Sequence, residues 1–226
     1  MKKGLSLFFL LFSFILKSQS TSENEWGSWI MFYGDNHISE HLDIVTEFRL
    51  HQYEIYNALD NRFYKIGLGY QITPGVTVGA GYVHHYSETT TDINTSENRP
   101  YEEICIKSKI RKLGISHRYR MEHRWINKDG DTDFVNRMRY RLQLAHPICG
   151  KLYVKVFDEI FLDLDEDVFN QNRLHTGIGY HIDANFKFEV GYVKNHLSSR
   201  ADDIFRVGIL FNTDLRRKQD PTESSD

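Results

Sequence analysis

Apolar and polar residues alternate with a period of two along most of the chain, most clearly between residues 113 and 144. Successive side chains of a strand point to opposite faces, whereas a helix repeats every 3.6 residues, so this pattern predicts two half-buried strands. A polar break at 127–133 separates them. The polar face carries Ser116, Arg118, Arg120, Glu122, Arg124, Arg137, Arg139 and Arg141, and the other face carries Ile115, His117, Tyr119, Met121, His123, Trp125, Phe134, Met138, Tyr140, Leu142 and Leu144.

Similar alternation on both sides of this pair predicts about eleven strands of roughly 9–13 residues, the length that a tilted strand needs to cross a bilayer. Their ranges are 26–33, 42–53, 63–72, 76–86, 101–110, 113–126, 134–144, 152–159, 173–180, 186–192 and 204–211. We expect residues 21–215 to form an all-β, antiparallel up-and-down transmembrane β-barrel of about 10–12 strands. Because bacterial single-chain barrels have even strand numbers, ten or twelve are the expected values.

Connections between the predicted strands alternate in length. The segments 73–75, 111–112, 147–150 and 183–185 are short, whereas 87–100, 127–133, 163–169 and 198–203 are long. Short turns at one end and longer loops at the other are typical of outer-membrane barrels. A soluble periplasmic ligand-binding β-barrel stays an alternative, because soluble sheets also alternate apolar and polar residues.

The first twenty residues predict a secretory signal peptide. Lys2 and Lys3 precede an apolar run at 5–16, and the small residues Ser18 and Ser20 follow it. This run is too short to span a bilayer comfortably, so export is favoured over a membrane anchor. At the other end of the chain, the hydrophilic residues 216–226 predict a disordered tail.

Several segments carry a family resemblance. They are the Trp-rich start of the mature chain, HRYRMEHRW (117–125), RMRYRLQL (137–144), NQNRLHTGIGY (170–180) and FRVGILFN (205–212). In these segments, and over nearly all of the mature chain, the sequence resembles an uncharacterised family of outer-membrane β-barrels from Gram-negative bacteria, known as a domain of unknown function. The resemblance implies a location in the cell outer membrane and no known activity.

The last predicted strand also resembles the assembly signal of such barrels. Arg206, Gly208 and Phe211 have the expected spacing, and Thr213 stands where a final aromatic residue is usual. The implied partners are outer-membrane lipid and lipopolysaccharide, and the barrel-assembly machinery during biogenesis. We expect the barrel to be a monomer.

Charged residues of both signs on the inner face are the best functional candidates. They are Glu47, Arg49, Arg118, Arg120, Glu122, Arg124, Arg137, Arg139, Arg141, Glu159, Arg173 and Glu189. Buried arginines persist when they are paired, so we expect cross-strand ion pairs that largely fill the lumen and give the protein a structural role. The alternative is a narrow anion-selective pore, because rings of arginine favour the passage of phosphate or carboxylate.

A lipid-modifying enzyme in the barrel wall is another alternative. It would need a serine, a histidine and a carboxylate or amide together on the lipid-facing surface. His117 and His123 are predicted to point outward, but Ser116 points inward, and His84 and Ser87 also fall on opposite faces. The sequence therefore predicts no catalytic residues and no enzymatic activity.

Composition adds little to this interpretation. A net charge of −3 gives no electrostatic reason to expect nucleic acid binding. The two cysteines, Cys105 and Cys149, make no disulfide framework, and inert thiols are expected. The acidic run at 129–133 lacks the glycine and glutamate that an EF-hand needs at its sixth and twelfth positions. We therefore predict no metal site and no cofactor.

Overall fold

The computed structural model describes residues 26–53, 59–88, 94–165 and 168–216. Every regular element in these ranges is a β-strand, which confirms the all-β prediction. The strands are β1 (Trp26–His37), β2 (Leu42–Tyr53), β3 (Leu59–Thr73), β4 (Val76–Glu88), β5 (Asn94–Ile110), β6 (Leu113–Lys128), β7 (Asp131–Cys149), β8 (Leu152–Asp163), β9 (Phe169–His181), β10 (Phe186–Leu197) and β11 (Ala201–Asp214). The predicted signal peptide, 1–20, and the tail beyond residue 216 lie outside the described residues.

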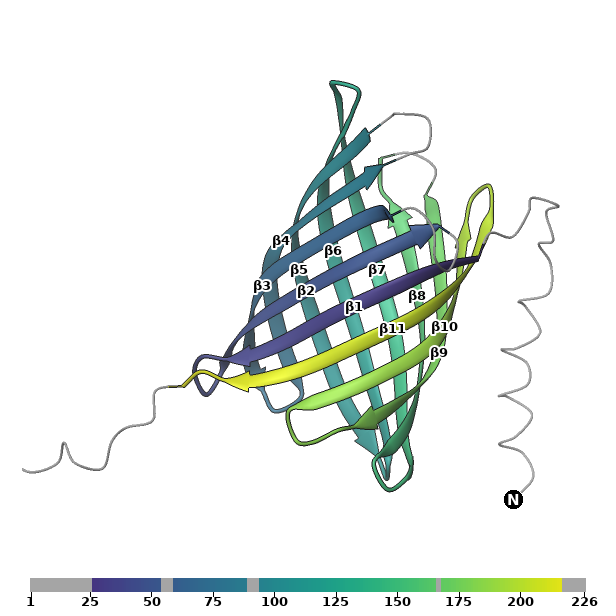
Figure 1. Ribbon diagram of the computed structural model, residues 1–226. Helices are drawn as coiled ribbons and strands as arrows, with labels where there is room; N and C mark the ends of the chain where they lie inside the picture. The colour runs from purple at the N-terminus through teal and green to yellow at the C-terminus, as the bar shows by residue number, and fades with distance from the viewer. Residues whose placement is uncertain (1–25, 54–58, 89–93, 166–167, 217–226) are drawn as a thin grey trace, which may run out of the picture.

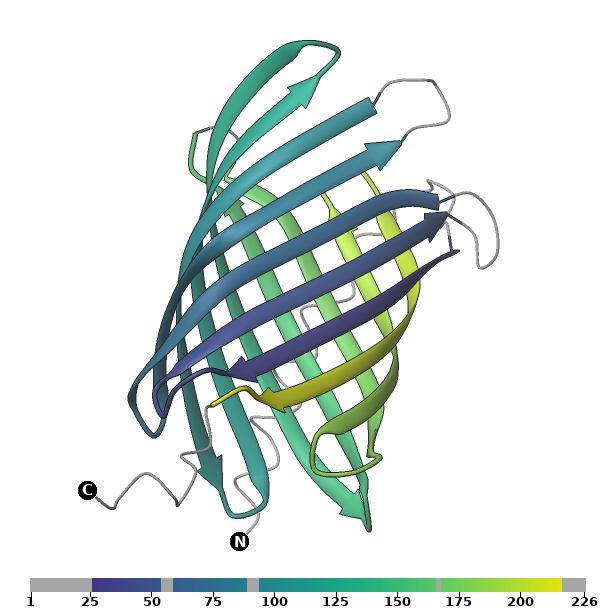
Figure 2. The same ribbon diagram turned by 60° about the vertical axis from the view of Figure 1, so that its left-hand side comes forward.

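The strands close into a barrel (Figures 1 and 2). Each strand pairs antiparallel with its neighbours in sequence, so that Glu122 of β6, for example, lies opposite Arg137 of β7. The barrel closes where β1 pairs with β11 in parallel, from Trp26 beside Asp203 to His37 beside Asp214. In the described part of the chain, no helix has the length and hydropathy required to cross a bilayer.

The expectation of an even number of strands was wrong, because the described residues form eleven. Strands of an up-and-down barrel reverse direction at every connection, so the first and last strands of an odd number run the same way. The barrel can then close only through a parallel ladder, whose hydrogen bonds are evenly spaced and slanted. That ladder runs along the whole of β1.

The strand connections define the two ends of the barrel. The turn end holds the connections 38–41, 74–75, 111–112, 150–151 and 182–185. The loop end is the opposite one, and the described connections 129–130 and 198–200 lie there. The long connection predicted at 127–133 was wrong, since β6 and β7 continue and meet in a two-residue turn. Asp129 and Gly130 make this turn with φ values of 53° and 94°, the left-handed conformation that tight hairpins favour.

The long connection predicted at 87–100 was also wrong in most of its length. Here β4 continues to Glu88 and β5 begins at Asn94. A strand that continues beyond the apolar zone of a barrel can carry polar residues on both faces, so the alternation disappears although the strand does not. The same effect accounts for the missed ends of β6 and β7.

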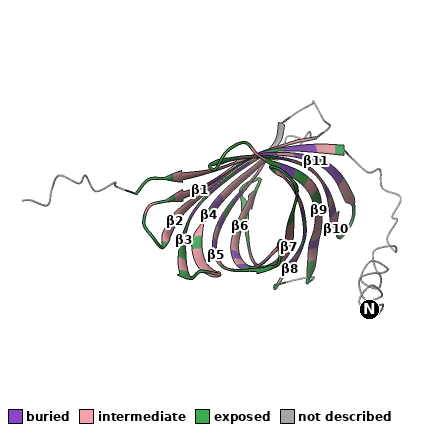
Figure 3. Cartoon of the chain, turned by 90° about the horizontal axis from the view of Figure 1, so that it is seen from below, coloured by how far each residue is buried: buried purple, intermediate pink, exposed green. Residues whose placement is uncertain are grey.

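The outer face of the barrel is apolar and the inner face is polar. On β3, the outward side chains of Ile66 and Leu68 are 58% and 53% exposed, whereas Lys65 next to them points inward and is 6% exposed. These faces agree with the predicted alternation. In a view from below, the strands enclose the inner face as a continuous wall (Figure 3).

Candidate functional site

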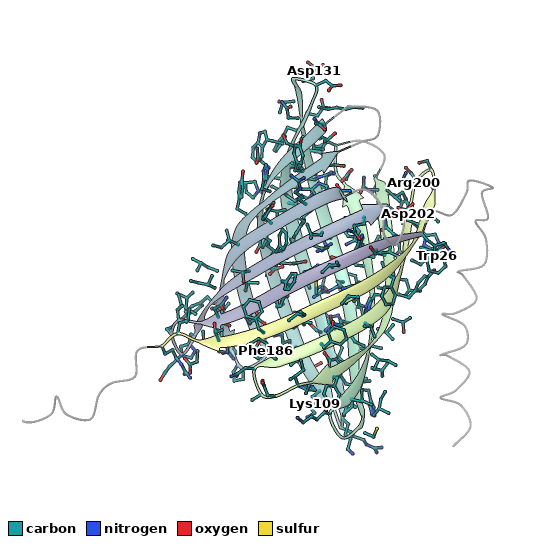
Figure 4. All side chains as sticks on the ribbon, viewed as in Figure 1. Trp26, Lys109, Asp131, Phe186, Arg200 and Asp202 are labelled. Atoms are coloured by element: carbon teal, nitrogen blue, oxygen red, sulfur yellow. The ribbon has the colours of Figure 1, made fainter. Side chains whose placement is uncertain are left out.

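A cavity of about 930 Å³ lies inside the barrel. Its lining extends from Lys107 near the turn end to Asp202 near the loop end. Figure 4 labels Asp202 and Asp131 at the loop end and Lys109 at the turn end. The inward-facing side chains of all eleven described strands therefore surround one elongated lumen.

Glu122 of β6 is the centre of the largest ion-pair cluster, and its side chain is completely buried. It accepts hydrogen bonds from Arg137 at 2.6 and 3.0 Å and from Arg139 at 2.5 Å. Arg120 and Arg99 add longer ion pairs at 3.5 and 3.7 Å. The register creates this cluster, because Glu122 lies opposite Arg137, and Arg120 lies opposite Arg139.

Two further glutamates extend this cluster to the strands on either side. Glu159 of β8 accepts hydrogen bonds from Arg139 at 2.7 Å and from Arg118 at 2.5 Å. Glu103 of β5 accepts one from Arg120 at 2.6 Å and lies 3.9 Å from Arg118. Each of these arginines thus bridges two carboxylates, and the network links β5 to β8 across the inner wall.

Glu97 of β5 holds the side of the network nearest the loop end. Arg99 lies 2.7 Å and Arg124 lies 2.5 Å from its carboxylate oxygens. Arg124 also lies 3.6 Å from Asp163. Glu97 is 4% exposed and Arg99 is 7% exposed, so these charges are buried although their positions were predicted to belong to a loop.

The remaining predicted charges form smaller groups. Glu47 pairs with Arg49 on β2. Glu189 pairs with Lys155, accepts a hydrogen bond from the Tyr153 hydroxyl at 2.7 Å and lies 3.3 Å from Arg206. The structure therefore divides the predicted charge set into a central network, two smaller groups around Glu47 and Glu189, and two arginines outside these groups, Arg141 and Arg173.

Three cations in the middle of the lumen have no carboxylate within 4.0 Å among the described residues. They are Lys65, Arg141 and Arg173, and all three line the cavity. Each lies over aromatic rings, with Arg141 5.5 Å from the centroid of Phe157 and Lys65 5.3 Å from that of Tyr101. Ring faces attract cations, but they leave the net charge uncompensated.

The predicted charge set omitted six charged residues in the middle of this lumen: Lys65, Glu97, Arg99, Glu103, Lys155 and Arg206, the last of which was assigned to the assembly signal. Lys65, Glu103 and Lys155 alternate with apolar residues on predicted strands, so the signal that located the others was present for these three as well. For Glu97 and Arg99 no such signal was available, because the residues around them are polar on both faces.

The residues of the predicted assembly signal do not share a face. Arg206 points into the lumen, where its guanidinium lies 3.0 Å from Nε2 of His175. Phe211 lies on the outer face, where it borders a small hollow together with Phe32 and Phe48. Gly208 faces inward beside the side chain of Met31. A role in assembly stays a prediction.

The histidines on the outer face have partners other than serine. Nδ1 of His117 lies 2.9 Å from the Tyr140 hydroxyl, and Nδ1 of His123 lies 2.7 Å from Oδ1 of Asn136. His84 lies in the same way 2.9 Å from Oδ1 of Asn98. Within the described residues, the arrangement thus gives none of these rings a hydroxyl nucleophile of the serine type.

Metal and thiol chemistry have little support in the described residues. No group of three or more His, Cys, Asp or Glu side chains is placed to hold a metal ion there. Both cysteines are free: Cys105 faces the lumen and Cys149 is exposed near the turn end. The two cysteines therefore form no disulfide with each other.

Residues 26–206 match a protein family described as a protein of unknown function, DUF2490. No curated protein matches the chain. Among solved structures, the NanC porin is similar with a TM-score of 0.54 and 13% sequence identity, over 78% of this chain and 89% of the porin. At this identity the similarity concerns the barrel fold alone.

Two larger barrels are more distant. The anion-selective porin from Comamonas acidovorans has a TM-score of 0.38 and 11% identity, over 76% of this chain and 53% of its own. The siderophore receptor PirA from Pseudomonas aeruginosa has a TM-score of 0.32 and 12% identity, over 73% and 32%. At these TM-scores neither structure supports an inference about this chain.

Proposed function

We propose that this chain, which belongs to the DUF2490 family of proteins of unknown function, is an outer-membrane β-barrel whose lumen forms a narrow pore that prefers anions. A closed barrel can satisfy all its backbone hydrogen bonds in lipid. The strands have 12 to 19 residues, more than the roughly 9–11 that a tilted strand needs to cross a bilayer. The fold shared with the NanC porin supports this location.

The outer surface supports the membrane location independently. Its large exposed side chains include Trp26, Ile30, Phe32, Tyr64, Ile66, Leu68, Tyr70, Ile72, Tyr82, Ile104, Ile106, Tyr119, Trp125, Phe134, Ile178, Tyr180, Phe186, Phe188 and Phe205. A soluble monomer rarely exposes apolar patches of more than a few hundred Å². In a bilayer the same residues face lipid, and tyrosine and tryptophan suit the two interfaces.

The excess of cations in the lumen is the observation that carries the proposal of anion preference. The middle of the described lumen has twelve cations, Arg49, Lys65, Arg99, Arg118, Arg120, Arg124, Arg137, Arg139, Arg141, Lys155, Arg173 and Arg206, and six carboxylates, Glu47, Glu97, Glu103, Glu122, Glu159 and Glu189. Lys107, Arg200 and four aspartates follow towards the ends. Cations therefore outnumber carboxylates along the path, which favours anions over cations.

The pore is narrow because most of these side chains fill the lumen. The ion-paired arginines lie against the wall and are largely buried, as Arg120 and Arg137 illustrate with 4% and 5% exposure. The cations without carboxylate partners, Lys65, Arg141 and Arg173, line the same cavity and leave positive charge uncompensated there. We infer that the paired charges support the barrel and that the unpaired ones set the ion preference.

Planar-bilayer recordings test the pore directly. We expect small, stable currents in KCl, and under a salt gradient a reversal potential with the sign of chloride selectivity. A cation-selective reversal potential would refute the anion preference. Complete silence of correctly folded protein would leave the barrel a structural role, with the charge network as its core.

Membrane fractionation and a heat-modifiable gel shift test the location. Recovery in the soluble periplasmic fraction without detergent would refute it and would favour the soluble ligand-binding barrel. Phospholipid hydrolysis that is lost on changing His117 or His123 would instead favour the enzyme. Outer-membrane lipid, lipopolysaccharide and the barrel-assembly machinery are the partners that this location implies.

A further inference from the structure

Arg173 combines two features that the other described guanidiniums of the lumen show at most singly. It has no carboxylate within 4.0 Å among the described residues, as Arg141 also does, and its Nε is buried without a hydrogen-bond partner, as that of Arg118 also is. A buried N–H of a charged group that makes no hydrogen bond costs free energy until it finds an acceptor. Because Arg173 lines the cavity, the missing acceptor can come from the lumen.

Two aromatic rings hold Arg173 in place. Its guanidinium carbon lies 4.7 Å from the ring centroid of Trp29 and 5.0 Å from that of Phe161. Trp29 is packed against Val193 and Ile204 on the wall, and Phe161 is 2% exposed. Rigid supports of this kind fix the guanidinium in advance, so that a ligand does not have to order it.

The same rings carry three more guanidiniums. Arg49 lies 5.2 Å from the Trp29 ring, and Arg139 and Arg137 lie 4.3 and 5.3 Å from the Phe161 ring. Their carboxylate partners are already engaged, since Glu47 pairs with Arg49, and Glu159 pairs with both Arg139 and Arg118. Arg137 shares Glu122 with Arg139. Four guanidiniums thus lie around two rings without enough negative charge to balance them, and like charges in a space of low dielectric need a counter-ion.

We propose that Arg173, flanked by Arg49 and Arg139, is the centre of a saturable binding site for an oxyanion, a phosphate or a carboxylate. The inference rests on the proposed function in one respect, because the anion must enter through the lumen. It goes further in naming one site and one class of ligand. A planar guanidinium presents paired N–H donors that match two oxygens of one anion, so an oxyanion is preferred to chloride.

The site is tested by calorimetric titration of the folded full chain in detergent. Inorganic phosphate and acetate are titrated separately at constant ionic strength, with sodium chloride as the reference salt. We expect saturable binding of one oxyanion per chain for at least one of these two probes, and none for chloride. Phosphate binding alone would identify a phosphate-type ligand, acetate binding alone a carboxylate. Absence of saturable binding for both probes would refute the site.

Matched variants separate a site from a diffuse positive field. Arg173→Gln should lower the affinity at least about tenfold, because a charge-assisted bidentate contact is lost. Arg141→Gln removes the same charge from another unpaired position of the lumen and should retain the affinity within about threefold. Equal losses in the two variants would refute the proposal.

A third variant and a comparison of binding with bilayer currents complete the test. Arg173→Lys retains the charge but not the planar fork, and it should bind oxyanions more weakly than the wild type. It also replaces Arg173→Gln if that variant fails to fold, as judged by its gel shift on heating. Saturable binding without bilayer currents would contradict the pore and leave the site standing, whereas anion-selective currents without saturable binding would contradict the site alone.

Discussion

Glu122 offers the sharpest test of how the lumen supports the barrel. Its side chain is fully buried, and four guanidiniums lie within 3.7 Å of its oxygens. The substitution Glu122→Gln keeps the shape and removes the charge. One amide oxygen can still accept a hydrogen bond, but the NH₂ group that replaces the other oxygen faces arginine donors.

The expected cost follows from the partners left behind. The hydrogen bonds from Arg137 and Arg139, at 2.6 and 2.5 Å, lose their charged acceptor. Removal of one partner from a buried ion pair typically costs about 3–5 kcal/mol, because the remaining charge stays buried and unpaired. We therefore expect Glu122→Gln to lower the free energy of unfolding of the barrel by about 3–5 kcal/mol.

Urea unfolding of the refolded barrel in lipid vesicles, followed by tryptophan fluorescence, measures this loss. Glu102→Gln on the outer face is the matched control: its side chain is 57% exposed and pairs with His123 at 3.4 Å, so its loss should be below about 1 kcal/mol. Adding Arg137→Gln to Glu122→Gln should recover part of the stability. A loss below about 1 kcal/mol for Glu122→Gln itself would refute the reasoning and show that lumen water screens these charges.

Three further outcomes are expected. Trp29→Ala removes a ring that supports two guanidiniums and should raise single-channel conductance, whereas unchanged conductance would place the constriction elsewhere. Gly81→Ala would drive a Cβ into a backbone oxygen of β3 and should cost about 1–3 kcal/mol in urea unfolding, while Gly114→Ala, with 3.6 Å of clearance, should be nearly neutral. Cys105 lines the lumen, so in a Cys149→Ser background an anionic methanethiosulfonate should modify it faster than a cationic one, as mass spectrometry can measure, and equal rates would speak against a positive lumen.

The alternation of apolar and polar residues was enough to predict the barrel and the direction of most side chains. The alternation is present where the outer face of a strand is apolar and its inner face is polar. The prediction failed where both faces of a strand are polar. Glu97 and Arg99 lie on such a part of β5. Asp129 and Gly130 close a hairpin, but the polar residues around them led to the prediction of a long loop.

The pairing of the charges could not be predicted from the sequence. Glu122 and Arg137 meet because of the register between β6 and β7, and a shift of one residue between the two strands would have turned the side chains of one strand to the other face. Among the described residues Arg173 has no carboxylate within 4.0 Å, although it lies on the same face as the paired arginines, and only the three-dimensional distances distinguish it from them.

The parallel closure of β1 on β11 has a consequence for topology. The chain enters β1 at Trp26 at the loop end and leaves β11 at Asp214 at the turn end. In an even-numbered barrel the first and last strand ends lie at the same end, whereas here they lie at opposite ends. In the proposed outer-membrane location, insertion must therefore carry one end of the barrel sequence across the bilayer, and reporters fused ahead of Trp26 and after Asp214 would be reached by protease from opposite sides.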